Sequence, residues 1–393
     1  MKPKTAILAS LVAVLVLTIS GCTSGAPSPP PCCDTAWSNV DGFGIAVANN
    51  QNNPAPVLPE SLDPLMEKVL PAQSVIPIFS ATATPTLITY KPLNIPPNGT
   101  TSGNASRIDK NIDRINKALT STPTGPGQNL FEAMLMAREA LGDVRHPVIA
   151  VVGSGLDSAP SVMNTTQGLL LAPPDQIAQY VREHNPNVDL SSTTIVLCSL
   201  GYTSLPQEPL SAGRRQLVIA AWTAAIEALG GTVQVIAAPN TAAAVSTDQP
   251  VPTTGFDKSC VLQGNTVTYT FDSSLLPFGK GEYVLNEQAE AALAEAVTIL
   301  QRYPGAQITI IGFTDTDGTP EYNYDLGMRR AEAVAAYLRI HLGQDLAITV
   351  DSMGESRLKV DETGKTGLEL TIAQQANRRI ELSISGTTTG CPS

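Results

Sequence analysis

Two residues of opposite charge stand out in the stretch GFTDTDGTPEYNYDLGMRRAEAV, which runs from Gly312 to Val334. Asp315 follows an apolar run, at a position typical of a turn. Arg330 lies four residues after Leu326 and four before Val334, so in a helix it shares their apolar face. A buried guanidinium is costly unless an anion meets it. That anion is either a carboxylate of the protein, with the arginine stem packed on the core, or a group of a ligand.

The surrounding segments predict a compact α+β domain over residues 264–386. Alternating apolar residues in NTVTYTF predict a strand, and LNEQAEAALAEAVTILQRYPG predicts a helix that ends at Pro304-Gly305. AQITIIGF predicts a strand that leads into the turn at Asp315, and DLGMRRAEAVAAYLRIHLG predicts the next helix. LAITVDSMGES and NRRIELSI predict further strands. The whole pattern predicts a mixed sheet with helices on one face.

These residues carry a resemblance to a known family. The motif positions are Thr314-Asp315, Gly318, Tyr322-Asn323, Leu326, Arg330-Ala331 and Asn377-Arg378-Arg379. In this order and spacing they resemble the OmpA C-terminal peptidoglycan-binding domain, over about residues 265–386. GTPEYN and LGMRRAEAV are especially similar to its peptidoglycan-associated lipoprotein branch.

The resemblance implies a ligand, the diaminopimelate of peptidoglycan stem peptides, whose free end carries an ammonium and a carboxylate on one carbon. The family's aspartate, here Asp315, binds the ammonium, and its arginine, here Arg330, binds the carboxylate. The supporting positions carried over from the family are Asp272, Thr314, Asn323 and Arg378. Phe313 stands where the family commonly has a histidine or another polar residue, so it either stacks on the ligand or packs inward.

Residues 41–240 predict a separate α/β domain. Apolar runs such as GFGIAVAN, HPVIAVVGS and TTIVLCSLG alternate with helical segments, which is typical of a parallel sheet covered on both faces. Pro77 in SVIPIFSA suggests an edge strand, and Cys198 is expected to be a buried core residue. The order of elements resembles the von Willebrand factor A (vWA) fold.

The vWA resemblance implies a metal site, but this chain does not keep its ligands. The corresponding turns read Asn49-Asn50-Gln51-Asn52-Asn53, Gly127-Gln128-Asn129 and Gly153-Ser154-Gly155, with no carboxylate among them. A hard divalent cation needs oxygen ligands, usually charged ones. We therefore predict a vWA-like domain with a degenerate site that holds no metal, and a protein that uses no cofactor.

The N-terminal stretch MKPKTAILASLVAVLVLTISGC predicts a signal peptide over residues 1–21. Its end is either a generic cleavage site or a lipobox, which Ile19-Ser20-Gly21-Cys22 resembles. The lipobox implies acyl chains such as palmitate on Cys22 and a place on the outer side of a bacterial membrane, facing the cell wall. Residues 22–40 predict a tether, 241–263 a linker and 387–393 a tail.

The net charge of −11 argues against nucleic-acid binding, which depends on a basic surface. An oxidising compartment would permit a disulfide. Cys260 and Cys391 flank the last domain and could close it, but five cysteines remain besides Cys22, so their pairing stays open.

Two functions fit these features. The first is a non-catalytic lipoprotein of the cell envelope that links a membrane to peptidoglycan, with the first domain binding an unknown envelope protein. The alternative is a cell-wall enzyme that the OmpA-like domain docks on peptidoglycan. His146, His184 and His341 have no metal-ligand spacing, and no Gly-x-Ser-x-Gly motif occurs. We therefore predict no catalytic residues.

Overall fold

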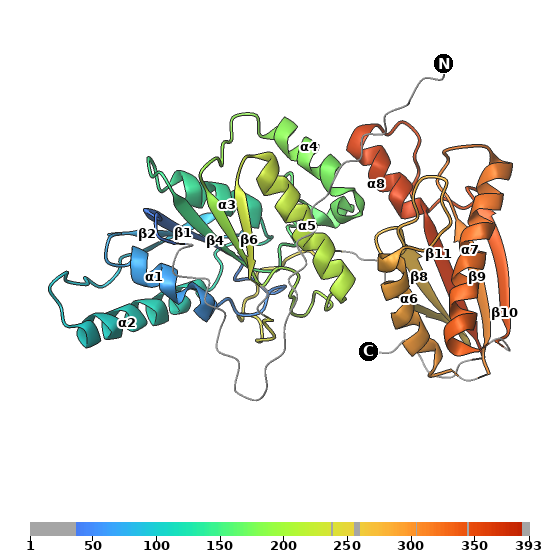
Figure 1. Ribbon diagram of the computed structural model, residues 1–393, viewed down its shortest axis with the longest axis horizontal. Helices are drawn as coiled ribbons and strands as arrows, with labels where there is room; N and C mark the ends of the chain where they lie inside the picture. Colours follow the sequence, from blue (N-terminus) through green and yellow to red (C-terminus); the bar gives the residue numbers. More distant parts are fainter. Residues whose placement is uncertain (1–36, 237–238, 255–259, 304, 344–345, 387–393) are drawn as a thin grey trace, which may run out of the picture.

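The computed structural model describes residues 37–236, 239–254, 260–303, 305–343 and 346–386. Two β-sheets lie side by side along the long axis of the molecule, the first made by residues up to 236 and the second by residues from 260 (Figure 1). Within this described part of the chain, no helix has both the length and the apolar character needed to cross a membrane.

The first sheet has six strands in the order β3-β2-β1-β4-β5-β6. All neighbours pair in parallel except β2 and β3, which are antiparallel. The strands are β1 (Gly42–Val47), β2 (Ile76–Ser80), β3 (Thr86–Tyr90), β4 (Pro147–Val152), β5 (Thr194–Cys198) and β6 (Thr232–Ile236). The central strands β1 and β4 are buried at every position, which explains their unbroken apolar runs.

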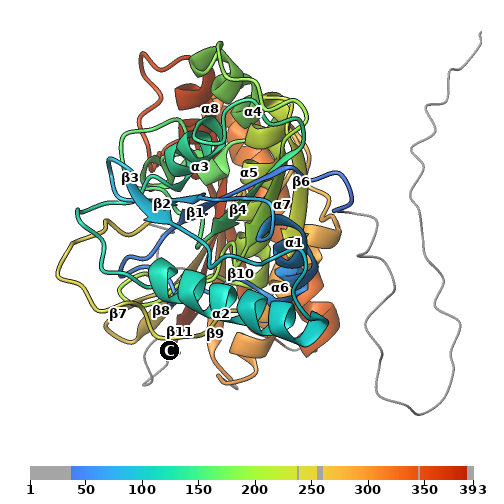
Figure 2. The same cartoon turned by 90° about the vertical axis from the view of Figure 1, so that its left-hand side faces the viewer.

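Helices cover both faces of the first sheet, as the α/β prediction required. One face packs against α1 (Asp63–Val69) and α2 (Thr101–Leu119). The other packs against α3 (Leu130–Glu139), α4 (Pro174–His184) and α5 (Ala212–Ala228). Figure 2 shows α2 running across the molecule well apart from α4. The short 3-10 helices are η1 (Glu60–Leu62), η2 (Thr165–Gln167) and η3 (Leu169–Leu171).

The prediction of an edge strand at Pro77 is wrong. β2 lies inside the sheet, and Pro77 is paired with Thr89 of β3, which forms the edge instead. β3 was not predicted because its sequence, TLITY, is short and half-exposed, and Leu87 points its apolar side chain to solvent. Cys198 is fully buried at the end of β5, as predicted, and burial raises the pKa of its thiol to about 12.

The second sheet has five strands in the order β10-β9-β11-β8-β7. β9 and β10 pair in parallel, and the other neighbours are antiparallel, so the sheet is mixed as predicted. The strands are β7 (Cys260–Gln263), β8 (Thr266–Asp272), β9 (Gln307–Phe313), β10 (Ile348–Gly354) and β11 (Arg379–Ser385).

Two long helices, α6 (Glu287–Leu300) and α7 (Pro320–Leu342), pack on one face of this sheet. The Thr319 hydroxyl caps α7 by accepting a hydrogen bond from the Tyr322 amide at 3.3 Å, and Pro320 occupies the first turn. A third helix, α8 (Gly367–Asn377), was not predicted. It lies at the end of the sheet that faces the first domain (Figure 1).

Candidate ligand-binding site

A close crossing of α7 over β9 brings the two halves of the quoted stretch together. Gly312 in β9 faces Gly327 in α7, and a Cβ atom on Gly312 would overlap the Gly327 carbonyl oxygen. Only glycine permits such an approach of two backbones. Asp315 follows the end of β9, and Arg330 lies one helical turn after Gly327. The crossing therefore places an acid and a guanidinium at the same end of the domain.

The Asp315 carboxylate is 5% exposed and already has protein partners. Its Oδ2 is paired with Nη1 of Arg378, and its Oδ1 accepts a hydrogen bond from the Asp317 amide at 3.2 Å. Burial raises the pKa of Asp315, and the guanidinium of Arg378 opposes that rise. The structure thus pairs Asp315 with Arg378 and not with Arg330.

The Arg330 side chain is 2% exposed and is held by backbone carbonyls. Its Nε donates to the Glu282 oxygen at 2.9 Å, and its Nη2 donates to the Gly279 oxygen at 3.0 Å. Its guanidinium carbon lies 5.1 Å from the ring centre of Phe278. Burial, followed by the nearby charge of Arg378, lowers the pKa of Arg330 to about 10, so the group stays cationic at neutral pH.

Asp315, Arg330 and Arg378 line one pocket of about 370 Å³. Its other walls come from three segments: Lys280 and Gly281 of the loop before α6, Asp317 and Gly318 of the turn between β9 and α7, and Tyr322 and Leu326 of the first turns of α7. Nζ of Lys280 forms an exposed ion pair with Oδ2 of Asp317 at 2.6 Å. The pocket thus presents three cations and two carboxylates.

Three predicted site residues lie outside this lining. Asn323 is fully buried, and its Nδ2 donates to the Asp315 carbonyl oxygen at 3.2 Å and to the Glu355 carboxylate. Thr314 is buried, and its amide donates to the Gly354 oxygen at 2.9 Å. The Asp272 carboxylate accepts hydrogen bonds from the amide and hydroxyl of Ser274. Asn323 and Thr314 hold the Asp315 turn, and Asp272 holds the turn after β8.

The structure decides between the two roles left open for Phe313. Its ring is 1% exposed, and the guanidinium carbon of Arg379 lies 3.7 Å from the ring centre. Phe313 therefore packs inward under Arg379. Lys280, Asp317 and Tyr322 also line the pocket but were not predicted from the sequence. Of these, only Lys280 stands out in the sequence, as a lysine between two glycines in FGKGEY.

The pocket presents groups of both charges that complement a small zwitterion. The Nε and Nη2 groups of Arg330 are occupied, and among the described residues no hydrogen bond engages its Nη1. Arg378 uses Nη1 for Asp315. The two guanidinium groups can therefore offer remaining N–H donors to a carboxylate, while the carboxylate of Asp315 can accept from an ammonium.

The turns of the first domain that the vWA resemblance marked as a degenerate metal site form a hydrogen-bonded polar network. Nδ2 of Asn53 donates to Oε1 of Gln128 at 2.7 Å, and the Ser154 amide donates to Oδ1 of Asn53 at 2.6 Å. Asp157, two residues beyond the turn, also joins this network. Its carboxylate accepts from the amides of Leu130 and Phe131 at 2.8 and 2.9 Å, at the start of α3.

Burial raises the pKa of Asp157 to about 6, and the hydrogen bonds from the Phe131 and Leu130 amides oppose the rise. In the described ranges no group of three or more His, Cys, Asp or Glu side chains gathers as metal ligands would. The absence of a metal and of a cofactor stays a prediction.

The chain after β6 folds back over this polar edge. The Pro250 carbonyl accepts from the Gly127 amide at 2.9 Å, and the Ala243 carbonyl accepts from the Ala55 amide at 3.1 Å. Nδ2 of Asn52 donates to the Val251 and Pro252 oxygens at 3.3 and 3.1 Å. Much of the segment predicted as a linker is therefore bound to the first domain, at the edge where parallel α/β sheets usually bind ligands.

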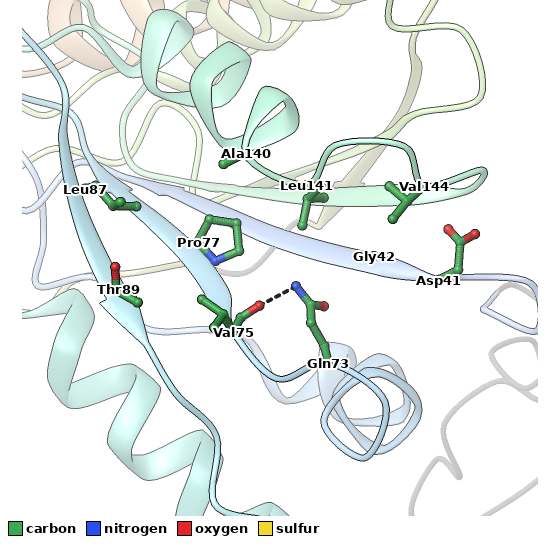
Figure 3. A pocket seen from close by; sticks show the side chains of 10 residues that line it. All are labelled: Asp41, Gly42, Gln73, Val75, Pro77, Leu87, Thr89, Ala140, Leu141 and Val144. Atoms are coloured by element: carbon green, nitrogen blue, oxygen red, sulfur yellow. Dashed lines mark hydrogen bonds between the residues drawn. The ribbon is translucent and has the colours of Figure 1, made fainter.

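A second depression of about 300 Å³ lies at the start of β1, beside β2 and β3 (Figure 3). Its walls are mainly apolar and include Pro77, Leu87 and Leu141. Nε2 of Gln73 donates to the Val75 oxygen at 2.8 Å, and the Asp41 carboxylate accepts from the amides of Arg145 and His146. Its polar groups are thus engaged in holding the ends of strands.

The predicted lipid anchor and the possible disulfide depend on cysteines whose side chains lie outside the described part of the structure. Cys22 and Cys391 lie outside the described residues, and of Cys260 only the backbone, in β7, is described. The lipid anchor and the disulfide therefore stay predictions.

Residues 277–369 match the model of the OmpA family. The peptidoglycan-associated lipoprotein of Pasteurella multocida is 39% identical over 93 residues, which are 24% of this chain and 56% of that protein. The protein of the same name from Haemophilus influenzae is 45% identical over 74 residues, 19% of this chain and 42% of that protein. The chain thus spans about half the length of these curated relatives.

Among solved structures, the peptidoglycan-associated lipoprotein from Burkholderia pseudomallei is 30% identical to this chain. The match covers 30% of this chain and 89% of that one, with a TM-score of 0.24. The C-terminal domain of this chain, which contains the residues that the family model matches, is an OmpA-like domain.

Proposed function

We propose that the C-terminal domain binds peptidoglycan and that its ligand is the zwitterionic end of diaminopimelate in the stem peptides. The observation that carries this proposal is that Asp315 and Arg330, fifteen positions apart in the chain, line one pocket. The ammonium binds Asp315. The carboxylate binds the N–H groups that Arg330 and Arg378 still have available.

The relatives support this proposal through their names, which describe lipoproteins associated with peptidoglycan. The charge balance of the pocket supports it as well. Three cations and two carboxylates suit a ligand that brings at least one carboxylate of its own. Because the whole chain is acidic, with a net charge of −11, this local arrangement supplies the affinity and not long-range attraction.

The other predicted residues act on the ligand indirectly in this proposal. Asn323 and Thr314 fix the turn that carries Asp315, and Asp272 fixes the turn that follows β8. Lys280 and Asp317 form the rim, where their exposed ion pair can open to admit the rest of the stem peptide.

The whole chain is, in this proposal, a non-catalytic lipoprotein of the bacterial cell envelope. Acyl chains on Cys22 anchor it to the outer side of a membrane, and the OmpA-like domain holds the cell wall. The first domain, whose six-stranded sheet is covered by helices on both faces, binds an envelope protein. The polar edge under residues 240–254 and the helical surface of α2 are the regions where such a partner can be sought.

Sedimentation with purified sacculi tests the peptidoglycan claim. Asp315→Asn keeps the size of the side chain but removes the charge that meets the ammonium, so the variant is expected to remain in the supernatant. Asp325→Asn is the matched control, because Asp325 lies on α7 with an exposed carboxylate. Sedimentation of Asp315→Asn as efficient as that of the control would remove Asp315 from the site.

A further inference from the structure

Helix α8 of the OmpA-like domain packs against the first domain. Leu368 and Ile372, one helical turn apart, pack against the apolar core on the α4 and α5 side of the first sheet. The elements of the first domain that α8 contacts are η3 and α4. Figure 1 shows α4 beside α8. Gly168 permits this contact, because a Cβ atom at that position would lie 2.9 Å from Cγ2 of Ile372. Its φ of 84° also favours glycine.

The same helix ends at the pocket. Arg378 is the C-cap residue of α8, and its guanidinium pairs with Asp315. The preceding residue, Asn377, is fully buried, and its Nδ2 donates to Oε1 of Glu362 at 2.7 Å. Oε2 of Glu362 accepts from the Thr316 hydroxyl at 2.6 Å. Both residues at the end of α8 thus reach the turn that carries Asp315, one directly and one through Glu362.

A helix transmits a displacement along its axis because its backbone is rigid. Ile372 and Arg378 are six residues apart, which is about 9 Å at 1.5 Å per residue. A shift of α8 on the first domain therefore moves Arg378 relative to Asp315, which β9 and α7 hold in place.

We propose that contact with the first domain positions α8, and through it Arg378 and the Asp315 turn, so that the affinity of the pocket depends on the docking of the two domains. Leu368 and Ile372 are positioning residues in this scheme. A partner that pulls the first domain away from α8 weakens the hold on the cell wall. The inference rests on the proposed function for its ligand, but the mechanical link stands on the contacts alone.

The test uses the full chain with Ile372→Asp, which places a charge in the apolar contact. Ile340→Asp is the matched control, because Ile340 lies on α7 with 74% of its surface exposed. Small-angle scattering measures the separation of the domains. Calorimetry with a diaminopimelate-containing muropeptide measures Kd. A carbon-13 NMR titration of the Asp315 carboxyl reports whether Arg378 is still beside it.

Ile372→Asp is expected to increase the radius of gyration. It should raise Kd about tenfold, which lies within the usual range of coupling between sites. It should also raise the pKa of Asp315, because Arg378 no longer lowers it. Ile372→Val keeps an apolar side chain in the contact, so it is expected to leave the radius of gyration, Kd and the pKa of Asp315 at their wild-type values. Where Ile372→Asp fails to fold, Leu368→Ala combined with Ile372→Ala replaces it, since alanine suits a helix.

Separated domains with Kd within twofold of the wild type and an unchanged pKa of Asp315 would overturn the inference. Domains that stay together in both interface variants would overturn it as well. A wild-type chain that binds no muropeptide would instead refute the proposed function, and the response of the Asp315 pKa would still decide the mechanical link.

Discussion

Replacement of Arg330 by lysine separates the shape of the guanidinium from its charge. In the structure the Arg330 fork donates to two carbonyl oxygens at once, those of Glu282 and Gly279. A lysine ammonium is a single point donor on a flexible stem, so it can replace at most one of these contacts in the same geometry. Arg330→Lys therefore leaves one carbonyl of the loop before α6 without its partner.

The expected cost follows from the hydrogen bond that is lost. Hydrogen bonds to charged groups contribute about 1.5–3 kcal/mol each, so Arg330→Lys should lower the free energy of unfolding of the C-terminal domain by roughly 2 kcal/mol. Because the loop that it holds carries Lys280 and Gly281 of the pocket wall, the variant should also raise Kd for a diaminopimelate muropeptide at least tenfold.

The two tryptophans allow the domains to be followed separately. Trp37 and Trp222 both belong to the first domain, so tryptophan fluorescence reports only that domain during urea unfolding. Circular dichroism reports both domains. With a urea dependence of about 2 kcal/mol per molar, the loss should lower the midpoint of the C-terminal transition by about 1 M. The fluorescence midpoint should stay close to that of the wild type.

Arg329→Lys is the control, because Arg329 lies next in the chain but has a half-exposed side chain paired with Asp325 across one helical turn. It should change neither the midpoint nor Kd. If Arg330→Lys unfolds at the wild-type urea concentration and binds the muropeptide as tightly, the two-pronged role of Arg330 is refuted.

Three further predictions concern other parts of the chain. Gly312→Ala should destabilise the C-terminal domain by several kcal/mol in urea unfolding, because its Cβ would overlap the Gly327 carbonyl. Gly213→Ala should cause no loss of stability, because its Cβ would lie 3.9 Å from the nearest atom, Cδ2 of Leu275, and alanine suits a helix; equal stabilities of the two variants would contradict the close crossing. Asp157 has a pKa of about 6 when folded and 3.8 as its ordinary value, so the folded state keeps a proton that the unfolded state releases. Its contribution to the free energy of unfolding should therefore fall by about 2 kcal/mol as pH rises from 4 to 6; a difference between wild type and Asp157→Asn that is constant over this range would speak against the raised pKa. Cys22→Ser should abolish metabolic labelling with palmitate, and a retained label would disprove the anchor at that residue.

Much of the C-terminal site can be predicted from the sequence because its parts lie in one stretch with strong periodicity. β9 and α7 follow from an apolar run and a helical stripe, and Asp315 and Arg330 line one pocket. The ion pair of Asp315 with Arg378 could not be predicted, because it joins residues 63 positions apart through the return of β11 beside β9. Lys280 could not be predicted either, because the loop before α6 that brings it to the pocket is also distant from Asp315 in the chain.

Other elements escape prediction because tertiary contacts define them. Leu368 and Ile372 of α8 pack against the first domain. The reason why these positions are apolar is therefore not contained in the sequence of the C-terminal domain alone. In β3 the apolar side chain of Leu87 is exposed, and the alternation of apolar and polar residues along the strand is weak. Pro77 suggested that β2 is an edge strand, but β2 tolerates this proline although it lies next to the edge strand β3. The polar network around Asp157 depends on a carboxylate outside the turns that the vWA resemblance marks.

The most direct test of the zwitterion site is a pair of titrations of the full chain with two muropeptides of equal length. One carries diaminopimelate, and the other carries lysine, which has the side-chain ammonium but not the carboxylate on the same carbon. The ammonium alone satisfies Asp315 and leaves the available N–H groups of Arg330 and Arg378 without a ligand carboxylate. We expect the diaminopimelate peptide to bind at least about 100-fold more tightly, a difference of about 2.7 kcal/mol. Equal dissociation constants for the two peptides would contradict recognition of a zwitterion in this pocket.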